Sequence, residues 1–477
     1  MDARRGSSFP ADATRLKILD TMFASSIHAH VMSGYEFLMQ SYTAGDRICI
    51  FGFSRGAYTA RSLAGMIHKV GLLPPNNFEQ VPFAYKMYSR TDTIGWEQSN
   101  EFKKAFCVSV DIEFIGVWDT VDSVGIIPKR LPFTTSNTLV KTFRHAVSLD
   151  ERRAKFKANL WNRPTSEEEK LGLPDPSHSA DPNVPALSKD ATVDSDEVSL
   201  LFKDDKKRKE KANGQPKKSR QGKGMTLGIR TVDSDDKLLN AYERIYSEKN
   251  ERMTDIEEVW FAGCHCDVGG GSVSNKTRHS LARIPLRWMV REIFKAQTGI
   301  LFITERLTEI GMDPSSLYPF VVPRPDALPV GENKIRNHPV KEIPIRPHML
   351  LTKKNRPTVA DVSKPPPITM LTSEEEEDLM DALSPLYDQL KVKKAWWFLE
   401  IIPLQLRYQR GNNQWVTYFG LNHAKPRFIP KQRAHGLKVH RSVKLRMEAE
   451  YEDERKRQKG KKYEPRPVFA VEPTWIG

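Results

Sequence analysis

Three segments of the chain combine a short apolar run with a polar residue just beyond it. The runs cover residues 48–51, 112–117 and 259–262, and they lead into Ser54, Asp119 and His265. Unbroken apolar runs of this length, rich in β-branched and aromatic residues, are typical of strands buried on both faces of a parallel sheet. Open α/β sheets bind their ligands beyond the carboxyl ends of such strands. The pattern therefore predicts a mostly parallel sheet with polar residues gathered at one rim.

Helical spacing surrounds the first of these runs. Between residues 14 and 40, the apolar residues Val31, Tyr35 and Leu38 follow an i, i+4, i+7 pattern. Apolar residues recur at helical spacing again from residue 60 to 67, until "GLLPP" ends the pattern. Similar patterns lie at 238–246 and 281–294. Together with the strands they predict an α/β fold in which helices flank the sheet.

Changes in composition divide the chain into four parts. We expect a first domain part at 1–162, which carries the serine motif, and a second part at 225–302. Residues 163–224 between them hold many charges and prolines and almost no aromatic residue. Such a composition cannot bury enough apolar surface to offset its ordering entropy, so we expect a disordered insertion. Residues 303–477 are expected to form a C-terminal accessory region.

Two stretches characterise this C-terminal region. The segment "AWWFLEIIPLQLRYQR", residues 395–410, is expected to cover one side of the core. Residues 443–462 are almost wholly charged, which predicts a solvated helix or tail.

Length and charge restrict the possible class of protein. The 477 residues can bury a substantial site, and the formal charge of +14 favours transient contact with anionic surfaces such as a membrane. Four cysteines are too few for a disulfide-stapled secreted scaffold. We find neither a signal peptide nor a long uncharged apolar stretch, and therefore expect a cytoplasmic protein. Nothing in the sequence indicates an oligomeric state.

The serine that follows the first strand lies in a G-x-S-x-G motif. Gly52, Ser54 and Gly56 fit the pattern, and a predicted strand precedes it while a predicted helix follows it. In this strand-turn-helix setting the serine adopts strained backbone angles, and the flanking glycines avoid collisions with neighbouring backbone. The serine is then a candidate nucleophile, and the backbone N–H of Arg55 is a candidate oxyanion donor.

A nucleophilic serine needs a base, and the base needs an orienting carboxylate. Asp119 and His265 both follow predicted strands, and the chain order Ser54, Asp119, His265 is the order found in α/β-hydrolases. These three residues form our predicted catalytic set. The alternative is that Asp119 caps a loop and that His265 is structural.

Other residues could replace the two partners. His145 is expected on a helix, His440 at the periphery, and His68 on the helix after the serine, too far along it to reach back. The alternative carboxylates are Asp122, Asp150 and Asp267, the last of which could instead cap the glycine turn.

The cluster from Cys264 to Asp267 also invites a metal hypothesis. Zinc sites usually pair two ligands with a second pair elsewhere, and the sequence has no evident second pair, so we expect neither a metal nor a cofactor. The glycines at 269–271 could form an anion-binding nest, but the Lys-Ser/Thr of a P-loop is missing. The basic run 206–223 lacks interleaved aromatic residues, so we expect a solvated linker rather than a nucleic-acid site.

Several blocks together resemble one known family. They are "GDRICIFGFSRGAYTARSLAGMIHKVGLL", "FIGVWDTVDSVG", "RHAVSLDERRAKF" and "VWFAGCHCDVGGG" followed by "IPLRWM". This combination resembles the α/β-hydrolase family that includes the catalytic domain of bacterial type VI secretion phospholipase effectors, and its fungal branch in particular. The resemblance implies hydrolysis of acyl esters of lipids or phospholipids, with Ser54 as nucleophile, Asp119 as acid and His265 as base. It implies a supporting role for Asp267 in its loop.

One departure from the family concerns the N-terminal side of the serine motif. Members of the family begin with a strand and an Asp-Gly-Thr-like turn, which this sequence lacks, so we expect an N-terminally truncated sheet. One oxyanion donor normally comes from a loop after an earlier strand, and its loss can reduce turnover about 10²–10³-fold. A non-catalytic relative that binds membranes or proteins is therefore the alternative hypothesis.

Overall fold

The computed structural model describes the larger part of the chain. The described residues are 27–121, 130–162, 230–232, 239–240, 242–243, 245–247, 254–275, 277–339, 373–409, 415–430, 432–452 and 460–477. The insertion expected at 163–224 and the alternative carboxylate Asp122 lie outside them.

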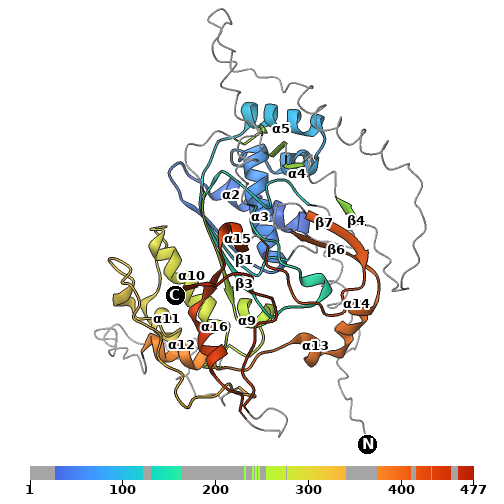
Figure 1. Cartoon of the computed structure of the whole chain (residues 1–477). Helices are drawn as coiled ribbons and strands as arrows, with labels where there is room; N and C mark the ends of the chain where they lie inside the picture. Colours follow the sequence, from blue (N-terminus) through green and yellow to red (C-terminus); the bar gives the residue numbers. More distant parts are fainter. Residues whose placement is uncertain are drawn as a thin grey trace, which may run out of the picture.

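A parallel sheet forms the centre of the fold (Figure 1). Within the described residues its strand order is β1-β2-β3-β5-β8-β9, and every neighbouring pair runs parallel. The strands are β1 (Ile48–Phe53), β2 (Ile112–Trp118), β3 (Val140–Ser148), β5 (Asp255–Phe261), β8 (Lys438–His440) and β9 (Thr474–Ile476). The predicted α/β class is therefore confirmed.

Helices cover both faces of this sheet (Figure 1). Those of the first face are α2 (Ile27–Ser41), α3 (Arg55–Val70), α4 (Val81–Ser89) and α5 (Thr93–Phe106), with the 3-10 turn η1 (Phe78–Gln80). Those of the other face include α10 (Arg283–Lys295), α12 (Glu374–Ala382) and α16 (Arg441–Glu448). Strand β2 contributes Ile115 and Val117 to the first core and Phe114 to the second. This two-sided burial explains why its sequence is continuously apolar.

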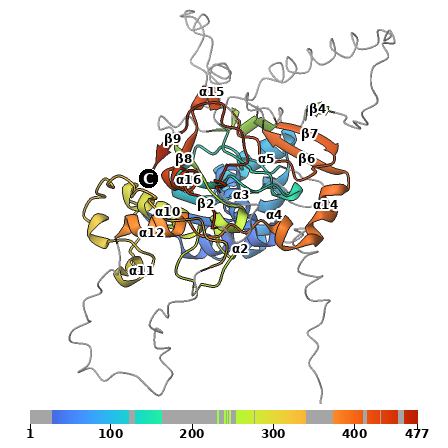
Figure 2. The same cartoon turned by 60° about the horizontal axis from the view of Figure 1, so that its bottom comes forward.

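A smaller antiparallel sheet of order β4-β7-β6 lies beside the central sheet (Figure 2). Its strands are β4 (Arg230–Val232), β6 (Leu404–Gln409) and β7 (Trp415–Gly420). The remaining elements are short: η2 (Ala154–Phe156), α9 (His265–Gly269), α11 (Thr304–Glu309), η5 (Pro314–Ser316), α13 (Gln389–Val392), η7 (Lys394–Trp396), α14 (Trp397–Ile401) and α15 (Gln432–His435).

The three strands predicted from apolar runs are confirmed, but the helix predicted around His145 is wrong. His145 lies in β3, between β2 and β5. The polar pair Arg144 and His145 obscures the strand pattern, and both side chains are buried with partners. Arg144 pairs with Glu292, and His145 pairs with Glu258 on β5. Because remote carboxylates pair with these two side chains, the strand can bury polar residues that the local pattern assigns to a helix.

The C-terminal region joins the central sheet directly. Strands β8 and β9 lie beyond residue 303, yet they extend the sheet after β5. His440, expected at the periphery, is buried at the end of β8, where its ring stacks on Phe261 with centroids 5.0 Å apart. The expectation of a wholly solvated stretch from residue 443 is also wrong, because α16 buries Val443 and Leu445.

Candidate active site

The chain makes a strained turn at Ser54, between β1 and α3. Ser54 has φ 60° and ψ −122°, a conformation that costs a non-glycine residue energy. A Cβ on Gly52 would lie 2.4 Å from the backbone oxygen of Gly56, so this position requires glycine. A Cβ on Gly56 would meet nothing within 4 Å. The predicted steric need for glycine therefore holds at the first position and is wrong at the second.

The three residues of the predicted catalytic set lie together. Ser54 Oγ is 2.7 Å from His265 Nε2, and His265 Nδ1 is 2.6 Å from Asp119 Oδ2. Ser54 and Asp119 directly follow the neighbouring parallel strands β1 and β2, so both residues lie at the same end of the sheet. His265 follows β5 and begins α9. The helix α3 begins at Arg55, whose backbone N–H belongs to the first turn of that helix.

The carboxylate of Asp119 is fully buried and has several partners. Its Oδ1 accepts hydrogen bonds from the backbone N–H of Ser148 at 2.8 Å and from Arg427 Nη1 at 2.5 Å. A second guanidinium nitrogen, Nη2, lies 3.0 Å from Oδ2. Burial alone would raise the pKa of Asp119, but the charge of Arg427 and the hydrogen bond with His265 hold this pKa well below its usual range. Asp119 is thus held as an anion.

Arg427 is the important residue that the sequence did not reveal. Its guanidinium is buried, and besides Asp119 it binds the Ser148 side chain and the carbonyls of Ser148 and Phe156. It lies 308 residues beyond Asp119, in a segment without a motif or a helical period. No local pattern could have paired these two residues. The carboxylate itself offers the only signal, because a buried anion needs a compensating charge.

Two aromatic rings and one glycine hold the His265 imidazole. The ring of Phe53 lies 4.6 Å from it between centroids, and Phe156 meets it edge-on at 4.8 Å. A Cβ on Gly269 would lie 1.9 Å from the Phe53 ring, so a larger residue there would displace the ring that contacts the imidazole. The backbone N–H of His265 donates to Glu151, 3.2 Å away.

Asp267 supports the loop in which His265 lies. Its Oδ2 accepts hydrogen bonds from the backbone N–H groups of Cys264 and Tyr387, at 2.9 and 3.0 Å, and Ser272 donates to Oδ1 at 2.7 Å. Burial raises the pKa of Asp267 to about 6, and these hydrogen bonds oppose the rise. These contacts agree with the supporting role that the resemblance implied.

The alternative residues have other partners. His145 Nδ1 is 2.9 Å from Glu258, and its Nε2 accepts the backbone N–H of Thr120. His68 stacks on a phenylalanine ring, and its Nδ1 is 2.8 Å from an asparagine side chain. Asp150 accepts hydrogen bonds from the backbone N–H of Gly263 and from the Tyr463 hydroxyl.

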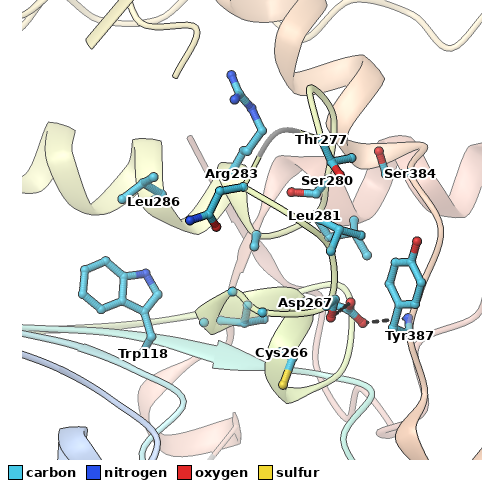
Figure 3. A pocket seen from close by; sticks show the side chains of 18 of the residues that line it. Trp118, Cys266, Asp267, Thr277, Ser280, Leu281, Arg283, Leu286, Ser384 and Tyr387 are labelled. Atoms are coloured by element: carbon cyan, nitrogen blue, oxygen red, sulfur yellow. Dashed lines mark hydrogen bonds between the residues drawn. The ribbon is translucent and has the colours of Figure 1, made fainter. Parts of the chain in front are cut away.

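A cavity of about 610 Å³ opens beside α9 (Figure 3). Among its lining residues are Phe53, Trp118 and Cys266, which are the chain neighbours of Ser54, Asp119 and His265. One wall is apolar, with Trp118 near Leu286, whereas Asp267 and Tyr387 face the opposite side (Figure 3). A cavity with an apolar wall and a few polar groups suits an amphipathic ligand.

The described residues contain one group of side chains with metal-ligand geometry. His279, Glu377 and Asp381 place one ligand atom each within 4.8 Å of one another. Arg278 and Arg287 already form ion pairs with these two carboxylates, and this charge compensation argues against a bound cation. In the sequence cluster considered earlier, the Cys264 thiol donates to the carbonyl of Asp150.

The fold and the site together define an α/β-hydrolase-like protein. The chain belongs to the family described as "T6SS, Phospholipase effector Tle1-like, catalytic domain", whose model matches residues 6–292. It is 30% identical to the uncharacterized protein YEL023C of Saccharomyces cerevisiae over 479 residues, which cover 87% of this chain and 67% of the relative. The recognised family is therefore confirmed, together with a fungal relative.

Two solved structures also match. One is a crystal structure of an uncharacterized protein from Pseudomonas aeruginosa, with 16% identity, a TM-score of 0.24, and coverage of 65% of this chain and 32% of the other. The second is the Tle1 effector bound to the VgrG spike from the type 6 secretion system, with 18% identity and a TM-score of 0.14. That match covers 32% of this chain and 28% of the other. The chain thus spans about a third of the length of these matched structures.

Among the described helices, none is both long and apolar enough to cross a membrane.

Proposed function

We propose that the chain is a serine hydrolase that cleaves acyl esters of phospholipids. The proposal rests on one observation above all, the continuous hydrogen-bond chain from Ser54 through His265 to Asp119. A serine at a strained strand-to-helix turn, a histidine at hydrogen-bond distance and a buried carboxylate are the groups that nucleophilic ester hydrolysis requires. The family description names phospholipases, which supports a lipid ester as the substrate class.

The reaction would proceed through an acyl-enzyme. Ser54 Oγ attacks the ester carbonyl carbon while its proton passes to His265 Nε2, and Asp119 stabilises the imidazolium that forms. The carbonyl oxygen becomes an oxyanion, and the backbone N–H of Arg55 is the proposed donor to it. As the C–O bond breaks, His265 returns the proton to the leaving alcohol. Water then attacks the acyl carbon and gives its proton to the same nitrogen. The bond from this carbon to Ser54 Oγ breaks, His265 returns the proton to Oγ, and the fatty acid is released.

The cavity beside α9 supports a lipid substrate. Its apolar wall, which includes Phe53, Trp118 and Leu286, provides a surface for an acyl chain. Its lining includes residues directly adjacent in the chain to all three catalytic candidates, so an acyl chain held there would bring its ester near Ser54.

Labelling with a fluorophosphonate probe tests the proposed nucleophile. We expect the unmodified chain to be labelled and Ser54→Ala to lose labelling, whereas Ser89→Ala, a change at the exposed end of α4, keeps it. A panel of phospholipids should yield lysolipid and fatty acid with the unmodified chain only. Labelling that survives in Ser54→Ala would exclude the assigned nucleophile.

The alternative of a non-catalytic binding module predicts a serine remote from every imidazole. The distance of 2.7 Å between Ser54 and His265 favours the enzyme instead.

A further inference from the structure

An exposed strip of apolar and basic side chains runs along α13, η7 and α14. We call it the lysine-aromatic strip, and it consists of Lys391, Val392, Lys393, Lys394, Trp397, Phe398 and Ile401. Phe398 is 61% exposed and Ile401 59%, and they lie in one short stretch with the exposed lysines. Helix α14 lies at the rim of the described fold in both views (Figure 1, Figure 2).

The inner side of the same segment is firmly held, so the strip cannot turn inward. Leu399 and Glu400 are buried beneath it. The Glu400 carboxylate accepts hydrogen bonds from the backbone N–H groups of Ala154 and Ala424, at 2.7 and 2.8 Å, and from the Asn422 side chain. A buried carboxylate with three donors fixes the orientation of its helix. The exposed residues therefore form a fixed surface.

This surface adjoins the candidate active site. Trp396, next to the strip in sequence, packs edge-on against Phe156 with centroids 5.6 Å apart, and Phe156 packs against the His265 ring at 4.8 Å. Tyr387, only a few residues before the strip begins, lines the cavity. Two ring contacts therefore separate the strip from the imidazole.

The charge of the strip indicates its partner. Three lysines alternate with or precede the apolar residues, and the only carboxylate between residues 389 and 403, Glu400, is buried. Two other exposed apolar residues, Leu301 and Phe320, flank a stretch with three acidic residues, at positions 305, 309 and 313, and one basic residue, Arg306. Only the first combination suits an anionic bilayer, which attracts lysines while apolar side chains enter the headgroup layer.

We propose that the lysine-aromatic strip docks on the surface of anionic lipid bilayers and so places the cavity beside α9 against its substrate. The statement that docking brings the cavity to its substrate rests on the proposed function, whereas binding to the bilayer does not require catalysis. A protein partner of the strip is the competing outcome.

Vesicle sedimentation tests the proposal. The protein carries Ser54→Ala, so that no lipid is consumed, and the vesicles contain phosphatidylcholine either alone or mixed with phosphatidylserine. We expect binding to the mixed vesicles, and we expect the triple change Lys391→Gln, Lys393→Gln, Lys394→Gln to weaken it about 100-fold. The double change Phe398→Ser, Ile401→Ser should weaken it as well. The matched control, Leu301→Ser with Phe320→Ser, changes two apolar residues that are even more exposed and should bind like the parent protein.

Three outcomes would overturn the proposal: equal binding to both kinds of vesicle, no binding to either, or strip variants that bind like the parent. Absence of vesicle binding would direct attention to a protein partner. Failure of the proposed function is distinguishable, because it would appear as a lack of ester hydrolysis by the unmodified chain while the vesicle result stands unchanged.

Discussion

The turn that presents Ser54 and the segment that presents Arg427 both serve the same three side chains, but they do so over different distances in sequence. At the turn, the decisive contact joins residues four positions apart, because a Cβ on Gly52 would collide with the backbone of Gly56. Arg427 reaches Asp119 across 308 residues and belongs to no motif. The site therefore depends on one region that is defined by local sterics and on another that is defined by charge pairing across the fold.

Substitutions in these two regions should therefore affect the reaction rate in different ways. A change at the turn alters where the serine oxygen lies, whereas a change at Arg427 alters the charge around the carboxylate. The first should reduce the rate at every pH, and the second should change the dependence of the rate on pH.

Asp119→Asn has the largest expected effect, because Asp119 is where the two regions meet. The amide removes the negative charge and places an N–H₂ group against the donors of Arg427 or His265. We expect kcat/KM for a soluble ester to fall about 10³–10⁴-fold. Asp150→Asn, a change in the alternative carboxylate, should leave most of the activity. Equal losses in both variants would contradict the assigned role of Asp119.

The two glycines of the serine motif provide a matched pair for the local region. Gly52→Ala places a methyl group 2.4 Å from a backbone oxygen, so the turn must shift, and a shift of this kind can cost about 10²-fold in rate. Gly56→Ala adds a methyl group that meets nothing within 4 Å. We expect Gly56→Ala to keep fluorophosphonate labelling and Gly52→Ala to lose most of it. Labelling rates of the two variants that fall together would refute the steric account of the turn.

The sequence predicts the parts of the site that depend on local contacts, but not the parts that depend on pairing between remote residues. The G-x-S-x-G motif, the strand before it and the polar residues after β2 and β5 are local features of the sequence, and the structure has strands where the apolar runs predict them. Strand β3 was missed because the partners that let it bury Arg144 and His145 are remote in sequence: Glu258 lies on β5, and Glu292 lies on α10. Arg427, β8 and β9 were missed for the same reason. Contacts between residues remote in sequence determine the structure at those positions, and no hydrophobic periodicity indicates such contacts.

Arg427→Gln tests the remote region. Its loss removes the positive charge that lowers the pKa of Asp119, so this carboxyl becomes protonated at a higher pH and the acid limb of the pH–rate profile should move to higher pH. At the optimum we expect a roughly tenfold lower rate from poorer positioning. The control Lys425→Gln changes an exposed lysine two positions away and should leave the profile in place.

Arg427→Lys adds a second measurement to this test. It keeps the charge but loses the two-nitrogen contact with the carboxylate, so it should restore the acid limb while the rate stays reduced. If Arg427→Gln lowers the rate without moving the acid limb, Arg427 acts on the fold alone.

Asp267→Asn should have the smallest effect, and it concerns the loop that carries His265 rather than either region. The pKa of Asp267 is raised to about 6 in the folded chain, above the value of about 3.9 for an unfolded chain. The folded state therefore binds more protons between these values, and this group makes the free energy of unfolding fall as the pH rises through that range.

Asparagine avoids this loss of stability, because its oxygen can accept from Cys264 and Tyr387 while its amide donates to Ser272. In urea unfolding, the variant should gain about 1–3 kcal/mol relative to the parent at pH 7.5 compared with pH 4.5. Asp313→Asn, which removes one exposed carboxylate, controls for general charge effects. A stability difference between Asp267→Asn and the parent that is the same at both pH values would show that Asp267 is not protonated in this loop.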